Sequence, residues 1–211
     1  MSSEIPTKPD AFVMAASEAD IAAVASALGQ NNIEALVVDT AAEARDLVLT
    51  LVPEGAEVHW AKSKTLDDLG LTEVFLDSGR YDPVRPKYQA LDRATQGAQI
   101  RKLMAAPDVM LGSVQAVTLE GALVTVSYAG SQIGPYAAAA GRVILVVGSQ
   151  KIVPGLDTAL RRAREYVMPY EDVRLREQLG VGTRLAKLLV IYLEARPGRT
   201  TVILVREPIG M

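Results

Sequence analysis

The chain has 211 residues, of which 49% are hydrophobic and 22% are charged, and its net charge is −3. This composition predicts a folded domain with a sizeable core, and it excludes both a disordered chain and the basic surface of a nucleic-acid-binding protein. The absence of cysteine excludes disulfides and thiolate metal sites, the single histidine argues against a zinc site, and no apolar run is long enough to span a membrane. We therefore expect a cytoplasmic protein that binds no nucleic acid, metal or membrane.

The N-terminal part predicts a leader followed by one domain. Residues 1–15, which begin "MSSEIPTKPD", read as a loose leader, and residues 16–211 read as a single α/β domain with no clean internal boundary. Ser17 opens "SEADIAAVASALG", where a capping residue, acidic residues in the first turn and a final Gly29 predict a helix. The apolar face of this helix is formed by Ile21, Val24 and Leu28.

The next three segments predict a strand, a helix and a strand. "EALVVD" is typical of a short buried strand, "TAAEARDLVLTLV" of a helix with a capping box formed by Thr40 and Glu43, and "AEVHW" of a second strand. This order predicts a parallel pair of strands joined by a crossover helix. His59 of the second strand fits a structural role better than triad chemistry, because no G-x-S-x-G motif accompanies it.

Three further helices are predicted between residues 63 and 105. "SKTLDDLG" has polar caps, and a second helix runs from Thr72 to Leu76. After a corner at "YDPVRP", residues 87–105 favour one long helix that Gly97 weakens.

The second half alternates strands with helices. Apolar runs predict four strands, at residues 109–111, 114–119, 122–128 and 143–147. Glu120-Gly121 predicts a hairpin turn between the second and the third of these. The Ala-rich segment that ends at Ala140 and "PGLDTALRRAREYVMPYED" predict helices, and "LLVIYLEA" and "TVILVRE" predict a hairpin-like pair of terminal strands. The pattern predicts an α/β fold with a mostly parallel sheet flanked by helices.

Small polar residues follow several of the predicted strands. Gly-Ser pairs begin at positions 112, 130 and 148, at a constant spacing of 18 residues and each after an apolar run. Open α/β sheets bind ligands beyond the carboxyl ends of their strands, where small residues let backbone N–H groups reach an anion. Candidate anion-binding residues are therefore Gly130, Ser131, Gln132 and Gly148, with Lys151 as the nearest cation. The alternatives are ordinary turns and a solvated lysine.

Two further segments supply candidate residues. In "SKTLDDLG", Ser63 and Thr65 can cap a helix and leave N–H groups free for an anion, and plain helix capping is the alternative. In "VTLEG", Glu120 ends an otherwise apolar run. A partly buried carboxylate there can act as a base or a nucleophile, and a surface turn is the alternative.

Most of the chain, from about residue 55 to its end, resembles the LUD (lactate-utilisation) domain family. The similarity is carried by "VTLEGALVTVSYAGSQIGPYAAAAGRVILVVGSQKIVPGLDTALRRAREYVMPYED" and by "LGVGTRLAKLLVIYLEARPGRTTVILVRE". "AKSKTLDDLGL" resembles the family's Ser-x-Thr-Leu-x-x-x-Gly-Leu element. "TLEG", with Thr118 and Glu120, resembles its Thr-(Glu)-x-Gly element, although Gly121 here follows the acid directly.

The resemblance implies a fold similar to that of the sugar-phosphate isomerase and coenzyme A transferase superfamily, in which Glu120 would match a catalytic nucleophile by analogy. It also implies a part in oxidising L-lactate to pyruvate alongside iron–sulfur partner proteins. The pocket predicted for a small anionic metabolite has Glu120 at its centre. Its expected ligand-binding residues are Ser63, Thr65, Thr118, Gly130, Ser131, Gln132, Gly148 and Lys151.

Three functions are compatible with the sequence. The first is an accessory component of L-lactate or related organic-acid oxidation. The second is a free-standing enzyme of the transferase or isomerase type, acting on a coenzyme A ester or a phosphorylated metabolite. The third is a non-catalytic regulatory or assembly module. The sequence leaves open the cofactor, whether turnover occurs on this chain, and whether the chain forms a homo-oligomer.

Overall fold

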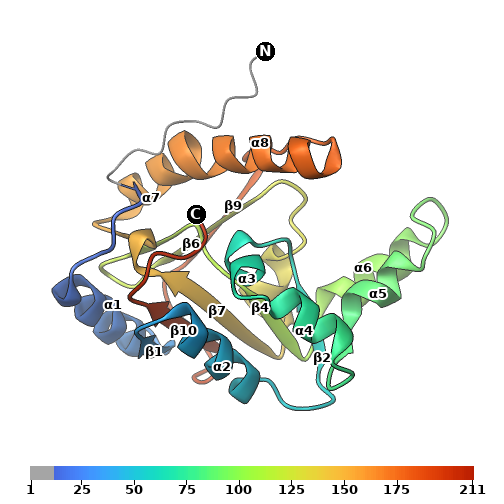
Figure 1. The fold of residues 1–211 in the computed structure, drawn as a ribbon, viewed down its shortest axis with the longest axis horizontal. Coiled ribbons are helices and arrows are strands. Elements are labelled where there is room, and N and C mark those ends of the chain that lie inside the picture. The colour runs from blue at the N-terminus through green and yellow to red at the C-terminus, as the bar shows by residue number, and fades with distance from the viewer. Residues whose placement is uncertain (1–11) are drawn as a thin grey trace.

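The computed structural model describes residues 12–211, and the predicted leader lies mostly outside this range. The main element is a six-stranded sheet in the order β1-β10-β7-β4-β2-β3, in which all neighbouring strands are parallel (Figure 1). Its strands are β1 (Glu34–Val38), β2 (Glu57–Trp60), β3 (Asp82–Pro83), β4 (Val109–Gly112), β7 (Arg142–Gly148) and β10 (Thr200–Val205). This sheet confirms the predicted α/β class.

A second, smaller sheet has the order β8-β5-β6-β9. Its strands are β5 (Ala116–Thr118), β6 (Leu123–Ser127), β8 (Ile152–Val153) and β9 (Lys187–Ile191). The antiparallel β5–β6 pair is the hairpin predicted from Glu120-Gly121, and Gly121 adopts a φ of 81° at its turn. β9 extends the sheet by pairing antiparallel with β6.

The first two helices begin where local sequence signals place them. Ser17 Oγ accepts the N–H of Asp20 at 3.1 Å and caps α1, and Thr40 Oγ1 accepts the N–H of Glu43 at 3.2 Å and caps α2. The α-helices are α1 (Glu18–Gln30), α2 (Ala41–Leu51), α3 (Lys64–Asp68), α4 (Leu71–Asp77), α5 (Val84–Gln89), α6 (Gly97–Ala105), α7 (Leu156–Arg162) and α8 (Met168–Leu179). The described residues also form two π-helices, η2 (Pro135–Ala139) and η4 (Ala163–Val167), and the 3-10 turn η3 (Ser149–Lys151).

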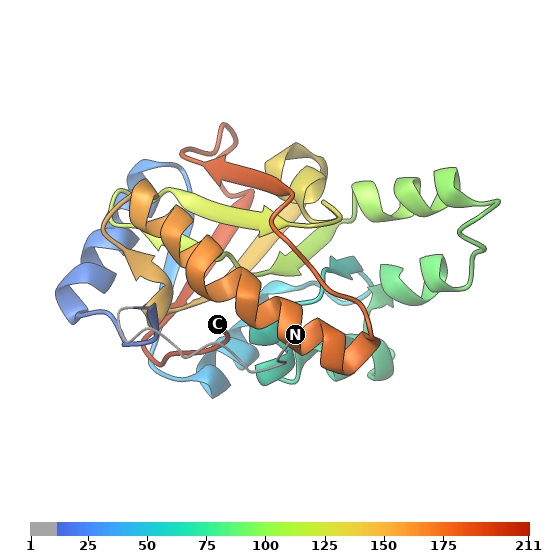
Figure 2. The same cartoon turned by 90° about the horizontal axis from the view of Figure 1, so that it is seen from above.

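The core has two halves, one on each face of the main sheet. Ile144 and Val146 of β7 face a cluster that includes α2, α3 and α4. Val143, Leu145 and Val147 face the opposite way, toward α1 and the second sheet. Because both faces are covered, the parallel strands are apolar at nearly every position. α7 packs on the far side of the second sheet through Leu156 and Ala159 (Figure 2).

Residues 84–105 form a helical hairpin, and Figures 1 and 2 both show that it projects from the body of the molecule. The sequence predicts one long helix over residues 87–105, and this prediction is wrong. Asp92 breaks it, because its carboxylate accepts the N–H of Ala94 at 2.9 Å and the hydroxyl of Thr95 at 2.8 Å. Such side-chain bonds compete with the helical backbone and favour a turn.

Two predicted strand pairings are also wrong. β1 and β2 lie in the same sheet but are separated by β10, β7 and β4, so the helix between them joins strands that are not neighbours. The terminal strands β9 and β10 belong to different sheets and form no hairpin. In both cases each strand pairs with an apolar strand far away in the sequence.

The packed chain already includes Phe12, which lies before the expected domain start at residue 16. Its side chain is buried and stacks on Tyr166 of η4, with the ring centroids 6.3 Å apart. Within residues 12–211, no helix combines the length and the hydropathy that crossing a bilayer requires.

Candidate functional site

A cavity of about 490 Å³ opens at the carboxyl edge of the main sheet. The segments that follow β2 and β7 contribute residues 61–65 and Lys151 to its lining, and the end of β4 with the residues after it contributes residues 112–115. The loop between β6 and η2 forms a second wall, and α8 with the residues that follow it forms a third. This is the place where open α/β sheets bind ligands, and the volume is typical of a pocket for a whole metabolite.

Lys151 lies on the floor of this cavity. The 3-10 turn η3 places it directly after β7, and its side chain is 2% exposed. Its Nζ donates to Thr65 Oγ1 and to Ser113 Oγ, both at 2.8 Å. It forms no ion pair with any of the described residues. Three segments that are distant in sequence therefore meet at one amine.

Burial controls the charge of Lys151. Desolvation is the largest effect and, together with the nearby positive charge of Arg162, lowers the pKa of Lys151 from 10.5 to about 7, while Asp68 opposes the shift. Arg162 is itself fully buried on α7 and donates to the backbone oxygens of Gln115 and Phe12. An uncompensated buried amine of this kind is a strong candidate for a functional group.

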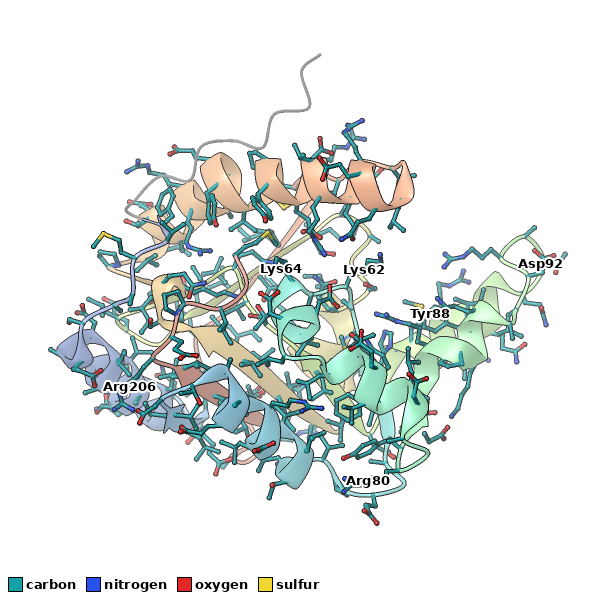
Figure 3. All side chains as sticks on the ribbon, in the orientation of Figure 1. Lys62, Lys64, Arg80, Tyr88, Asp92 and Arg206 are labelled. Carbon is teal, nitrogen blue, oxygen red and sulfur yellow. The ribbon has the colours of Figure 1, made fainter. Side chains whose placement is uncertain are left out.

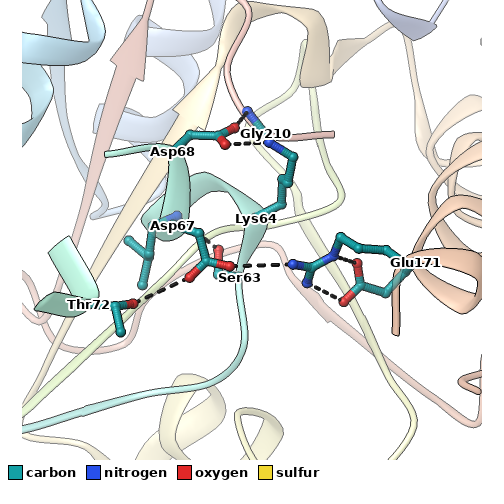
Figure 4. A network of polar contacts seen from close by, with 9 residues as sticks. Ser63, Lys64, Asp67, Asp68, Thr72, Glu171 and Gly210 are labelled. Atoms are coloured by element: carbon teal, nitrogen blue, oxygen red, sulfur yellow. Dashed lines mark hydrogen bonds and ion pairs between the residues drawn. The ribbon is translucent and has the colours of Figure 1, made fainter. Parts of the chain in front are cut away.

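The C-terminal segment passes directly over Lys151. Gly210 has a φ of 73°, and a side chain at this position would place its Cβ 2.2 Å from Thr65 Oγ1 and 3.1 Å from Lys151 Nζ. Asp68 of α3 accepts the N–H of Gly210 at 3.1 Å and also pairs with Lys64 (Figure 4). Only glycine lets the chain approach the amine so closely, and this approach keeps solvent away from it.

A polar bridge connects α3 with α8 across the cavity. Arg174 of α8 binds both carboxylate oxygens of Glu171, at 2.8 and 2.7 Å, and its other nitrogen lies 3.4 Å from Asp67 (Figure 4). Ser63 caps α3 by accepting the N–H of Leu66 at 3.4 Å, which is the plain capping role. Figure 3 shows Lys62 and Lys64 on the side of the molecule that faces α8.

The loop after β6 is held together by its own side chains. Gln132 Oε1 accepts hydrogen bonds from Ser127 Oγ at 3.1 Å and from Ser131 Oγ at 3.2 Å. Gly130 donates its N–H to Ser127 Oγ at 2.9 Å, and its φ of 88° turns the chain. Ser131 and Gln132 line the cavity, whereas Gly130 shapes the loop without lining it.

The structure brings five of the nine predicted site residues to the cavity: Ser63, Thr65, Ser131, Gln132 and Lys151. The other four are Glu120, Thr118, Gly130 and Gly148, and none of them lines it. Thr118 Oγ1 accepts the N–H of Ala122 at 3.0 Å within the β5–β6 turn. Gly148 leaves room for the backbone of Ile209, which a Cβ would approach to 2.5 Å.

Glu120 lies exposed in the β5–β6 turn, away from the cavity lining. Its backbone oxygen accepts a hydrogen bond from Asn31 Nδ2 at 3.0 Å, and the N–H of Gly121 donates a hydrogen bond to Thr118 O at 2.8 Å. The geometry is that of a hairpin turn docked on α1. The Glu120 carboxylate forms no hydrogen bond or ion pair with the described residues.

We expect Gly121→Ala to lower the free energy of unfolding by about 1–3 kcal/mol, because an alanine at positive φ is strained and its Cβ would lie 3.1 Å from the backbone of α1. The matched control in the same turn is Glu120→Gln, which removes an exposed charge and should change stability by less than about 0.5 kcal/mol. Urea unfolding measures both variants. Equal stability of the two would contradict this account of the turn.

Several cavity residues were not among the predicted site residues. Ser113 belongs to the first of the three Gly-Ser pairs, so the repeat was a signal that could have found it. Glu171 and Met168 come from the long helical segment, where their side chains read as part of an amphipathic pattern. Tyr136 lines the cavity from η2 and donates to Ser113 O at 3.4 Å.

A second, smaller hollow of about 210 Å³ adjoins the cavity. The two share Tyr128, Gly182 and Thr183, and the hollow adds Arg176 and Arg184. The Arg184 guanidinium lies 5.6 Å from the centre of the Tyr128 ring.

The fold and the cavity define an α/β protein with a metabolite-sized pocket at the carboxyl edge of a parallel sheet. The sequence matches the LUD domain over residues 21–205, and the chain belongs to the LUD domain family. Among solved structures, it is similar to the crystal structure of a DUF162 family protein from Deinococcus radiodurans. That similarity has 15% sequence identity and a TM-score of 0.48, and it covers 90% of this chain and 99% of the other. The comparison with curated proteins gave no match.

Proposed function

We propose that the cavity binds a small carboxylate metabolite beside Lys151, and that the protein is a component of the oxidation of L-lactate to pyruvate. Membership of the LUD domain family supports the pathway, and the cavity supports the ligand class. The single observation that carries the proposal is the buried Lys151 amine, which has no carboxylate partner among the described residues.

The surroundings of Lys151 suit an acid with hydroxyl or oxo groups. Thr65 and Ser113 present hydroxyls next to the amine, and Ser131 and Gln132 supply further polar groups on the opposite wall. Lys62 lines the same cavity as a second cation. A carboxylate bound here gains a charge-assisted hydrogen bond in a site that excludes much of the solvent.

Calorimetric titration with L-lactate and with pyruvate tests the binding. We expect Lys151→Met to weaken the affinity by about 10- to 100-fold, because a hydrogen bond to a charged group contributes about 1.5–3 kcal/mol. Lys102→Met, which removes an exposed lysine of α6 outside the cavity, is the charge-matched control and should bind normally. Absence of binding to the wild type, or equal affinities of the two variants, would overturn the proposed site.

The pH dependence of L-lactate binding gives a second readout with a definite sign. A bound carboxylate favours the ammonium form of Lys151, whose pKa in the free protein is about 7. Binding therefore takes up a proton above pH 7, and the affinity should fall as the pH rises, by up to about tenfold per pH unit. Lys151→Met should lack this dependence.

The place in L-lactate oxidation is tested in cells. Loss of the gene should slow L-lactate consumption, and the wild-type gene but not Lys151→Met should restore it. The chain contains no cysteine, so the proposal assigns any iron–sulfur cluster to partner proteins. Affinity purification from lactate-grown cells should then recover a cysteine-rich partner. Unchanged L-lactate consumption without the gene would overturn the assignment.

One observation favours a second candidate, an enzyme that acts on a coenzyme A ester or a phosphorylated metabolite. A three-carbon acid fills only part of the cavity, and the adjoining hollow with Arg176 and Arg184 suits phosphate groups. Coenzyme A esters and sugar phosphates should then raise the melting temperature more than L-lactate does. Arg184→Ala should remove that difference while leaving the effect of L-lactate unchanged.

A further inference from the structure

We propose that Lys151 is a nucleophilic amine that forms a reversible imine with a 2-oxo acid in the cavity; this inference rests on the carboxylate site proposed above.

The hydrogen bonds of Lys151 leave one position of the amine free. Ser113 Oγ donates its own hydrogen to Val146 O at 2.6 Å, so it accepts the hydrogen bond from Nζ. Thr65 Oγ1 accepts the second one at 2.8 Å. A neutral amine has two N–H donors and one lone pair. Because both donors are used and residues 12–211 provide no third partner, the lone pair is available to a ligand.

The neutral form of the amine is accessible at physiological pH. Burial and the charge of Arg162 lower the pKa of Lys151 to about 7, so a large fraction of molecules carries an uncharged amine there. Lysines that are desolvated and placed near another cation are activated as nucleophiles in this way. Lys62 and Lys64 also line the cavity, but both are more exposed than Lys151.

The chemistry balances without any co-reactant. The lone pair of Nζ attacks the C2 carbonyl carbon of the 2-oxo acid, and the electrons of the carbonyl bond move to its oxygen. That oxygen takes up a proton, for which the Thr65 hydroxyl is the nearest relay, and Nζ loses one of its own. The resulting carbinolamine then expels its hydroxyl as water with the second N–H proton, and a C=N bond remains. L-Lactate has no carbonyl group at C2 and cannot follow this path.

Trapping with sodium borohydride tests the inference on the intact protein. Treatment with pyruvate and borohydride should increase the mass of the protein by the mass of pyruvic acid minus one oxygen atom. Peptide mass spectrometry should locate this modification on Lys151. L-Lactate with borohydride is the negative control. The yield should rise as the pH increases through about 7, which is opposite to the trend expected for L-lactate affinity. Modification of exposed lysines alone, with Lys151 unmodified, would overturn the inference.

A variant gives a second, independent readout. Lys151→Met keeps the unbranched chain up to the ε position and removes a buried amine, so it should fold at least as stably as the wild type. It should show no pyruvate adduct on the cavity peptides, whereas Lys102→Met, which removes an exposed lysine outside the cavity, should still be trapped on Lys151. An adduct of equal yield in Lys151→Met would contradict the assignment.

The outcomes separate this inference from the function on which it rests. If both L-lactate and pyruvate bind in a Lys151-dependent way and no adduct is trapped, the imine is excluded and the carboxylate site stands. If neither acid binds and no adduct forms, both proposals fail. If pyruvate is trapped on Lys151 but loss of the gene leaves L-lactate consumption unchanged, the imine stands and the role in L-lactate oxidation fails.

Discussion

Replacing Arg199 with methionine should lower the free energy of unfolding by about 3–5 kcal/mol, because it leaves a buried carboxylate without its partner. Arg199 and Glu194 form an ion pair of 2.7 Å, and their side chains are only 5% and 8% exposed. Thr200 Oγ1 also donates to the Glu194 carboxylate, at 2.6 Å. Without the guanidinium, this hydroxyl is the one donor left among the described residues to satisfy a carboxylate that has lost most of its hydration.

Arg199 also supports the wall of the cavity. It donates to three backbone oxygens of the η2 region, those of Pro135 and Tyr136 at 2.6 and 2.9 Å and that of Ala140 at 3.3 Å. Pro135 O also accepts the N–H of Ala140 at 3.2 Å, whereas the carbonyl groups of Tyr136 and Ala140 lie at the end of the π-helix and depend on Arg199. In Arg199→Met, amide hydrogen exchange should therefore accelerate in residues 135–140 more than in α1. The first segment loses its hydrogen bonds to the guanidinium, whereas Arg199 forms no hydrogen bond with α1.

Urea unfolding with Arg206→Met as the control tests the prediction. Arg206 also pairs with two carboxylates, those of Glu18 and Asp39, but its side chain is 40% exposed. Loss of an exposed pair should cost less than about 1 kcal/mol. The double variant Arg199→Met with Glu194→Leu should recover part of the lost stability, since it removes the unpaired charge. A decrease of under about 1 kcal/mol for Arg199→Met would contradict this account.

The sequence predicts the elements whose signals are local. Ser17 and Thr40 start helices because their side chains cap N–H groups only three residues away, and Gly121 turns a hairpin because it adopts a positive φ. Strand pairing has no such signal. "EALVV" and "TVILV" are both short apolar runs, and each lies next to the other in the sheet although more than a hundred residues separate them. Apolar runs do not encode their neighbours, so the order of the parallel strands could not be derived.

In the candidate site, too, the features with local sequence signals are predictable and those that depend on distant segments are not. Small residues after the strands predict a pocket at the carboxyl edge of the sheet, and five of the predicted residues line the cavity there. An acid among apolar residues predicts burial for Glu120, but the side chain of a turn residue can point outward whatever its neighbours are, and Glu120 is exposed. The burial of Lys151 depends on Gly210 and Thr65, which arrive from the far end of the chain and from α3. No local pattern around the lysine contains that information.

The second large effect concerns His59, which makes the stability of the fold depend on pH. Its side chain is 1% exposed, and neither ring nitrogen has a hydrogen-bond partner among residues 12–211. Tyr88 of α5 packs edge-on against the ring, with the centroids 5.8 Å apart. Burial first, and then the positive charge of Arg85, lowers the pKa of His59 from 6.5 to about 4. The imidazole is therefore neutral in the folded chain over most of the accessible pH range.

The sign of the effect follows from proton binding. Between pH 6.5 and about pH 4 the unfolded chain binds a proton at His59 that the folded chain does not, so acidification favours unfolding. The contribution of His59 to stability is complete above pH 6.5 and is lost as the pH falls through this window. The shift corresponds to a total loss of about 3 kcal/mol, at about 1.4 kcal/mol per pKa unit.

Urea unfolding of the wild type and of His59→Leu at pH 7 and at about pH 4.5 isolates this contribution. Carboxylates also titrate in the same range, but they do so in both proteins, and the difference between the two therefore reports His59 alone. The wild type should lose about 2–3 kcal/mol more than His59→Leu between the two pH values. Parallel pH profiles would show that His59 is protonated or solvated in the folded state. Tyr88 of α5 would then not pack against His59 closely enough to exclude water from the imidazole.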